Sequence, residues 1–421
     1  MELTTLALLL AQIAAIILVS RGLGLVARAL GQPLVIAEMV AGIVLGPSLF
    51  GLLFPHAFST LFPPASLPVL KQLSQLGLVL FMFLVGLELD PELLRGRRRA
   101  SIAISHTSIM LPFVLGVGSA WWLRDGYAPP GVGFVPFALF LGTAMSVTAF
   151  PVLARILTER GLMQSRVGAI AIACAAVDDV TAWCLLAVVV AIAHAHGASD
   201  ALWTVGLAAV FSAFMLFVGR PLLRRAGERI SARGGLTPTT IAGVLLLLMV
   251  ASGITELIGI HALFGAFLFG AVLPKEGGLS KALAEKFESV AVVLLMPLFF
   301  AFSGLRTRLG LVSGVEQWLV VAALIGLATL GKFGGSAVAA RLTGLRWREA
   351  NAIGVLMNTR GLMELIVLNV GMDLGVITPA MFTMLVLMAL FTTFATTPIL
   401  RWVYPDREFL RETDGALLTR T

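Results

Sequence analysis

Long apolar stretches separated by short polar segments make up most of the sequence. A helix that crosses the roughly 30 Å hydrocarbon core of a bilayer needs about 20 mostly apolar residues. Dividing the chain at charges, prolines and glycine clusters leaves thirteen such stretches: 3–20, 32–50, 68–88, 101–123, 132–157, 163–193, 201–219, 237–258, 260–274, 287–305, 315–340, 348–371 and 376–400. The pattern predicts an all-α polytopic membrane protein with thirteen transmembrane helices.

Composition agrees with this prediction. Of the 421 residues, 58% are hydrophobic and 13% are charged, and the mean hydropathy is +0.98. A typical soluble domain has about 25% charged residues, and a water-soluble protein of this length would need far more polar surface. Soluble enzymes, nucleic-acid-binding proteins and secreted disulfide scaffolds are therefore excluded. Cys174 and Cys184 lie ten residues apart in one stretch, about 15 Å along a helix, so they cannot pair and are expected to be packing residues.

The distribution of basic residues orients the predicted helices. Of the 30 Lys and Arg residues, 24 fall in loops on one side, and two lie inside predicted spans. The other four, on the opposite side or at its margin, are Lys71, Arg124, Arg306 and Arg308. Basic residues concentrate in cytoplasmic loops. We therefore expect a location in the inner (plasma) membrane, with the N-terminus outside and the C-terminus in the cytoplasm. The net charge of +7 would suggest a nucleic-acid partner in a soluble protein, but these loops account for it, so no such partner is expected.

An odd number of helices permits two six-helix halves joined by a linker helix. Helices 1–6 and 8–13 would then enter the membrane from opposite sides, which is the inverted-topology repeat of many secondary transporters. Two pairs of short segments support the repeat: 84–88 resembles 302–306, and 142–146 resembles 354–358. The sequence therefore predicts two inverted six-helix repeats.

Helices 5 and 12, which correspond in the two repeats, are both expected to be discontinuous. Helix 5 carries Ser146, Thr148 and Pro151, and helix 12 carries the run Asn358–Thr359–Arg360–Gly361. Proline and glycine interrupt helices, and the polar groups can satisfy the freed backbone. Interruption at matching places favours crossed broken helices that line an ion site over a simple kink.

Five ionisable residues lie at membrane depth: Asp178, Asp179, Lys332, Arg360 and Glu364. Charge at this depth is costly and usually functional. Successive residues of a helix point about 100° apart, so the two aspartates cannot share a proton as the dyad of an aspartyl protease does, and each needs a different partner. Lys332 is expected to pair with one of them, the alternative being a lysine that extends to the membrane surface.

Arg360 and Glu364 are four residues apart and lie on one face of a helix. We expect them to neutralise each other, or to cap the dipoles of the broken helix, and to act as electrostatic scaffolding more than as ligands of an ion. Asn358 and Thr359 belong to the same polar group at the predicted break.

Taken together, these residues resemble the monovalent cation:proton antiporter-2 family, which includes bacterial sodium or potassium/proton antiporters and plant cation/H+ exchangers. The resemblance covers nearly the whole chain. The segments that carry it are Gly31–Gln32–Pro33, 41–48 (AGIVLGPS), 83–89 (FLVGLEL), 175–180 (AAVDDV), 259–262 (GIHA) and 358–365 (NTRGLMEL).

The resemblance implies a division of the helices. Helices 1–3 (residues 1–100) and 8–10 (237–314) would form a dimerising scaffold, and helices 4–6 (101–200) and 11–13 (315–400) a moving core. Residues 201–236 would hold the linker helix, and 401–421 a short cytoplasmic tail. A homodimer in the lipid bilayer is implied, and no cofactor and no enzymatic activity are expected.

The resemblance also implies roles for individual residues. Asp179 would carry the cation and the proton, and Asp178 would pair with Lys332. Thr148 and Ser146 are candidate oxygen ligands, because hard monovalent cations prefer oxygen. The implied function is exchange of Na+ and/or K+ for protons by alternating access, electrogenic if Lys332 also releases a proton. The alternatives are a sodium-coupled symporter of an organic anion on a related fold, and a channel-like protein.

Overall fold

The computed structural model describes residues 5–88, 98–163, 165–194, 198–232, 236–275 and 278–405. Every regular element in these ranges is helical. The chain divides into two compact units. Unit 1 comprises Met1–Arg21, Ala41–Asp90 and Ala187–Leu305, and unit 2 comprises Gly22–Val40, Pro91–Leu186 and Arg306–Thr421. Most of the predicted cytoplasmic tail, from residue 406 onward, lies outside the described residues.

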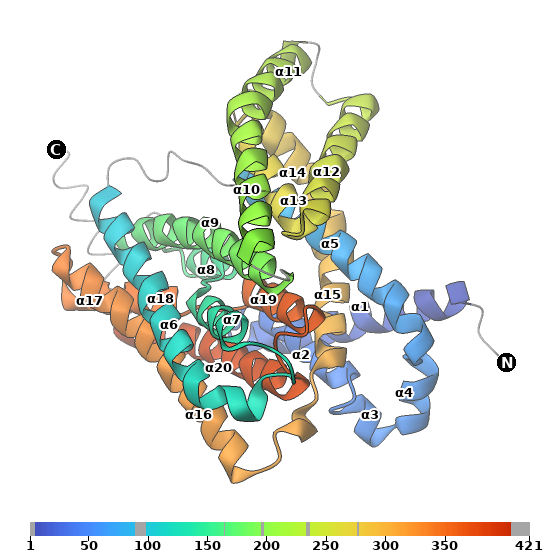
Figure 1. Ribbon diagram of the computed structural model, residues 1–421, viewed down its shortest axis with the longest axis vertical. Helices are drawn as coiled ribbons and strands as arrows, with labels where there is room; N and C mark the ends of the chain where they lie inside the picture. The colour runs from blue at the N-terminus through green and yellow to red at the C-terminus, as the bar shows by residue number, and fades with distance from the viewer. Residues whose placement is uncertain are drawn as a thin grey trace. The chain divides into compact units, whose positions relative to one another are not determined.

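Unit 1 is built from helices of both predicted repeats (Figure 1). It includes the first part of α1 (Thr5–Ala29), the last part of α2 (Leu34–Leu45) and the end of α9 (Arg166–His194). Its other helices are α3 (Phe50–Leu53), α4 (Pro55–Leu61), α5 (Leu67–Glu88), α10 (Ala198–Phe214), α11 (Arg220–Ala232), α12 (Pro238–Ile258), α13 (Ala262–Val272), α14 (Leu279–Glu288) and α15 (Met296–Arg306) without its last residue.

Unit 2 holds the remaining parts of α1, α2 and α9. Its other helices are α6 (Arg98–Tyr127), α7 (Phe134–Ser146), α8 (Phe150–Glu159), α16 (Val315–Thr329), α17 (Gly335–Leu342), α18 (Trp347–Met357), α19 (Leu362–Asp373) and α20 (Pro379–Val403). A π-helical turn, η7 (Leu330–Gly334), joins α16 to α17. The chain therefore passes between the units several times.

The all-helical membrane prediction is confirmed. Twelve helical segments among the described residues are long and apolar enough to cross a membrane. The ninth predicted helix, at 260–274, is α13, which has only 11 residues. His261 caps its N-terminus and the chain turns at Leu273, immediately before Pro274, so the helix cannot extend in either direction. Of the two cysteines, Cys174 is buried as predicted, but Cys184 is exposed on α9, so its prediction as a packing residue was wrong.

Two contacts between glycines hold unit 1 together. Gly42 of α2 lies against Gly304 of α15, and Gly86 of α5 lies against Gly270 of α13. In all four places an added Cβ would overlap the backbone of the opposite helix. Helices associate in lipid chiefly through close packing of this kind. The first contact joins predicted helices 2 and 10, and the second joins helices 3 and 9. Helix 2 corresponds to helix 9 in the inverted repeat, and helix 3 to helix 10, so the two contacts are equivalent.

Replacing Gly304 by alanine is expected to destabilise the protein, because its Cβ would overlap the backbone of Gly42. Overpacking of this kind typically costs about 1–3 kcal/mol, which thermal unfolding in detergent would record as a lower melting temperature. Gly253 of α12 is the matched control, since an added Cβ meets nothing within 4 Å there. Equal melting temperatures for the Gly304→Ala and Gly253→Ala variants would contradict the close contact.

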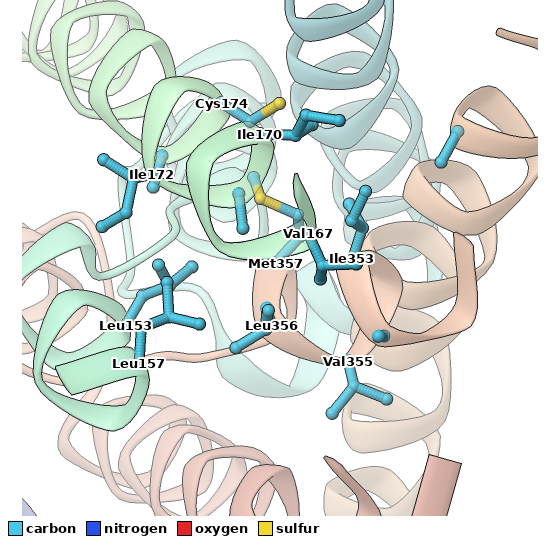
Figure 2. Packing of buried hydrophobic residues seen from close by; sticks show 14 of the residues in the cluster. Leu153, Leu157, Val167, Ile170, Ile172, Cys174, Ile353, Val355, Leu356 and Met357 are labelled. Carbon is cyan, nitrogen blue, oxygen red and sulfur yellow. The ribbon is translucent and has the colours of Figure 1, made fainter. Parts of the chain in front are cut away.

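An apolar core in unit 2 packs α8, α9 and α18 against one another. Figure 2 shows Leu153 and Leu157 of α8 near Leu356 of α18, with Val167 and Ile170 of α9 close by. These side chains are buried, at 2% exposure or less. The core fixes one half of each broken helix against α9, the helix that carries both aspartates.

Candidate functional site

Helix 5 is interrupted where the sequence predicts it. Helix α7 ends at Ser146, and Val147 and Ala149 have extended backbones before α8 begins at Phe150. Pro151 stands in the first turn of α8. Proline has no N–H and clashes with the preceding turn, so it is tolerated at the start of a helix and not in its interior. Pro151 therefore explains why the helix restarts here.

Helix 12 is interrupted at the matching place. Helix α18 ends at Met357 and α19 begins at Leu362. Gly361 has φ 153° and ψ −126°, a conformation that side chains rarely adopt, and a Cβ there would lie 2.9 Å from Val152 Cγ2. The N–H of Ala149 donates to the carbonyl of Thr359 at 3.0 Å, so the two breaks touch. The predicted crossing of broken helices 5 and 12 is confirmed.

Arg360 caps the end of the other broken helix. Its guanidinium is fully buried and donates to the carbonyls of Ala144 at 3.0 Å and Met145 at 2.7 Å, in the last turn of α7. The same guanidinium bonds Glu364 Oε2 at 2.9 Å. Carbonyls at a helix C-terminus lack partners and carry partial negative charge. Arg360 thus provides donors for the last carbonyls of α7, and Glu364 neutralises the charge of Arg360.

The carboxylate of Asp178 is surrounded by donors. Its Oδ1 accepts a hydrogen bond from Ser105 at 2.6 Å, and its Oδ2 accepts from Ser108 at 2.6 Å and Thr148 at 2.8 Å. Lys332 Nζ lies 3.0 Å from the same Oδ2. A carboxylate has about four lone-pair sites. Asp178, which is fully buried, therefore has four donors around its carboxylate, three at Oδ2 and one at Oδ1.

Lys332 lies in the π-helical turn η7 and is fully buried. Its ammonium bonds Asp178 and also donates to the hydroxyl of Thr148, in the break of helix 5. The side chain thus does not reach toward a membrane surface, and the alternative of a surface-seeking lysine does not apply. Single π-turns occur often at functional sites.

Asp179 has a different environment from its neighbour. It is 1% exposed, and neither carboxylate oxygen has a hydrogen-bond partner among the described residues. The backbone N–H of Phe150, at the start of α8, is a neighbouring donor. The expectation that each aspartate finds a different partner holds for Asp178 only. The two adjacent carboxylates therefore differ: Asp178 has four donors, and Asp179 has no hydrogen-bond partner among the described residues.

The other residues predicted for the site lie close along the chain but make different contacts. Ser146 is buried and donates to the carbonyl of Thr143 in its own helix, at 2.9 Å, not to an aspartate. Asn358 Oδ1, Thr359 Oγ1 and Glu364 Oε1 are buried without hydrogen-bond partners in the described part of the chain. The site therefore holds several unsatisfied oxygens besides those of Asp179.

Two members of the site, Ser105 and Ser108 of α6, have no counterpart among the sequence predictions. They are three residues apart, so they lie on one face of the helix, and both are fully buried. Polar residues at helical spacing inside an apolar stretch are the signal that could have found them. Serine is common in membrane helices, so the spacing alone does not identify a partner.

The charges of the site leave one carboxylate uncompensated. Asp178 pairs with Lys332, and Glu364 pairs with Arg360. Among the residues that the structure describes, the carboxylate of Asp179 has no hydrogen-bond partner. An isolated buried carboxylate is costly in a medium of low dielectric. A positive charge close to Asp179 would offset this cost.

Comparison with known proteins places the chain among related sequences. Residues 13–403 match the family described as "Sodium/hydrogen exchanger, transmembrane". The Na(+)/H(+) antiporter NhaS4 of Synechocystis is 44% identical over 406 residues, covering 96% of this chain and 99% of that protein. The K(+)/H(+) antiporter 1 of Saccharomyces cerevisiae is 37% identical over 385 residues, covering 89% of this chain and 44% of that protein.

A plant relative and a solved structure extend the comparison. Cation/H(+) antiporter 17 of Arabidopsis thaliana is 43% identical over 409 residues, covering 97% of this chain and 50% of that protein, so this chain spans about half of its plant and yeast relatives. The sodium proton antiporter MjNhaP1 of Methanocaldococcus jannaschii superposes with a TM-score of 0.69 at 14% identity, covering 94% of this chain and 97% of that one. The shared fold is evident.

Proposed function

The chain belongs to the sodium/hydrogen exchanger family, and on that premise we propose that it exchanges a monovalent cation, Na+ and/or K+, for protons at Asp179. The relatives named for Na(+)/H(+) and K(+)/H(+) antiport support this range of cations. The observation that carries the proposal is the buried carboxylate of Asp179, which has no hydrogen-bond partner among the described residues.

Competition for this carboxylate is sufficient for exchange. Asp179 as a bare anion is costly to move through an apolar barrier, whereas a bound proton or cation neutralises it. A site that moves only when it is neutral returns with a proton whenever it has released a cation. Coupling of the two fluxes follows from this energy difference.

Two hydroxyl oxygens at the break of helix 5 complete the proposed cation site. Ser146 and Thr148 use their hydroxyl protons in other hydrogen bonds, and Thr148 also accepts from Lys332, so Ser146 keeps two lone pairs for a cation and Thr148 keeps one. A hard monovalent cation takes oxygen ligands. We expect Arg360 and Glu364 to hold the broken helices in place and not to bind the ion, since they bond to each other.

Lys332 supplies the proposed second proton. When a cation arrives at Asp179, the positive charge of Lys332 becomes less favourable, and Lys332 releases a proton. Asp178 would remain satisfied by Ser105, Ser108 and Thr148. Two protons would then move for each cation, and exchange would be electrogenic.

The arrangement in the cell is also part of the proposal. The distribution of basic residues supports an inner-membrane protein with its N-terminus outside and its C-terminus in the cytoplasm. Helices 4–6 and 11–13 are proposed to move as a core, and helices 1–3 and 8–10 to form the scaffold of a homodimer. Alternating access would then expose Asp179 to each side in turn.

Proteoliposomes that contain a pH-sensitive dye test the function. Addition of Na+ or K+ alone is expected to collapse an imposed pH gradient, with Li+ included to rank the cations. A sodium-coupled symporter would need an organic anion, and a channel-like protein would carry cation current without proton movement. Either result would refute the proposal. A voltage-sensitive dye then separates two protons per cation from one, because one-for-one exchange moves no net charge.

A further inference from the structure

Two adjacent aspartates offer a cation two anionic sites, and the hydrogen bonds at Asp178 distinguish them. Oδ2 of Asp178 has three partners: Ser108, Thr148 and Lys332. Among the described residues, Oδ1 has one donor, Ser105, at 2.6 Å. Hydrogen bonds to a charged group are short and strong. The hydroxyl of Ser105 therefore decides whether Oδ1 is free to attract a cation.

The helix that carries these serines is held at a fixed distance. On α6, Gly116 lies against Gly142 of α7, and Pro112 lies against Gly331 of η7. None of these three glycines has room for a Cβ. Close contacts of this kind fix the separation of helices. Ser105 and Ser108 lie on the same helix one to three turns away, so their hydroxyls are delivered to Asp178 by a rigid element.

From these contacts, and on the basis of the proposed function, we propose that Ser105, assisted by Ser108, is a positioning residue that compensates the charge of Asp178 and so keeps the cation at Asp179 weakly enough held to be released. An exchanger must release its cation on the far side. A second, poorly compensated carboxylate one residue away would strengthen cation binding by direct electrostatic attraction.

The surroundings of Asp178 offer no substitute for Ser105. The charged groups near it are Asp179 on α9, Lys332 on η7, and the neutralised pair Arg360–Glu364. Lys332 already bonds Oδ2. Among the described residues, loss of the Ser105 hydroxyl would leave Oδ1 buried with no donor.

The Ser105→Ala variant tests this inference in the proteoliposome assay, with Na+ and K+ added in steps. We expect the KM for the cation to fall severalfold, because more of the negative charge of Asp178 would act on the cation. About tenfold, the worth of a hydrogen bond to a charged group, is the upper bound. The maximal rate is expected to fall as well, because release slows. Ser108→Ala should give a smaller change in the same direction, since Oδ2 retains Thr148 and Lys332.

Matched variants separate positioning from general stability. Ser101, one turn earlier on α6, is fully buried and its hydroxyl has no hydrogen-bond partner among the described residues, so Ser101→Ala should leave KM unchanged. Ser105→Thr keeps a hydroxyl and should restore wild-type KM. If Ser105→Ala does not fold, Ser105→Cys, with its weaker donor, should still have a lower KM than the wild type.

The outcomes are distinct from those for the proposed function. A wild-type protein that moves no protons on cation addition would refute the function itself. A wild-type protein that exchanges normally, with a KM that is unchanged or higher in Ser105→Ala, would refute the role of Ser105. Failure of Ser105→Thr to restore KM would do the same, because the hydroxyl would then not be the cause.

Discussion

Replacing Asp179 by asparagine is expected to reduce cation-driven proton movement to the rate of liposomes without protein. The side chain of asparagine has nearly the same shape as that of aspartate, but it is uncharged and does not bind a proton or a cation near neutral pH. The replacement also removes the one buried carboxylate of the site that has no ion-pair partner in the described structure. The melting temperature of the Asp179→Asn variant in detergent should therefore equal or exceed that of the wild type.

The control for this variant is Asp200→Asn, in the first turn of α10, where the side chain is exposed. It should exchange at the wild-type rate. Retained exchange in Asp179→Asn would remove Asp179 as the carrier. A strongly lowered melting temperature would instead indicate that Asp179 has a structural partner, contrary to the geometry described above.

Replacing Arg360 by leucine is expected to destabilise the protein by about 3–5 kcal/mol, the usual cost of leaving a buried charge unpaired. Three acceptors would lose their donor together: the carbonyls of Ala144 and Met145 and the carboxylate of Glu364. Thermal unfolding in detergent would measure the loss. Transport should fall with it, since the end of α7 defines one edge of the broken helix.

Two comparisons isolate the buried pair. The double variant Arg360→Leu/Glu364→Leu should be less destabilised than Arg360→Leu alone, because no unpaired carboxylate remains. Arg224 and Glu228 of α11 have the same spacing but are each 63% exposed, and Arg224→Leu should cost less than about 1 kcal/mol. A single variant no worse than the double would show that the pair contributes little.

The arrangement of helices was largely predictable from the sequence, because apolar length and breaker residues act locally. Pro151 and Gly361 predicted the two interruptions, and both are present. Helix α13 is shorter than predicted, since apolar composition continues past the residues that end it. The short helices α3 and α4 had no prediction, because they fall almost entirely between the predicted spans 32–50 and 68–88 and are too short to cross a membrane.

The contacts within the site were less predictable. The sequence indicated which residues are costly to bury, and from this followed a pairing of Lys332 with one of the two aspartates. The family resemblance implied Asp178, and the two groups lie 3.0 Å apart. Partners that cost little to bury give no such signal, which is why Ser105 and Ser108 were missed. Ser146 was proposed on its position in the break, but the direction of its hydroxyl depends on the local backbone.

The cap on α7 has a consequence for biogenesis. The guanidinium that completes its last turn comes from a residue 215 positions later in the chain. A ribosome that has just released α7 and α8 into the bilayer has not yet made Arg360. Until the second half of the protein is synthesised, the carbonyls of Ala144 and Met145 need hydrogen bonds from water or lipid headgroups. The first repeat therefore reaches its final form only after the helix that carries Arg360 is inserted.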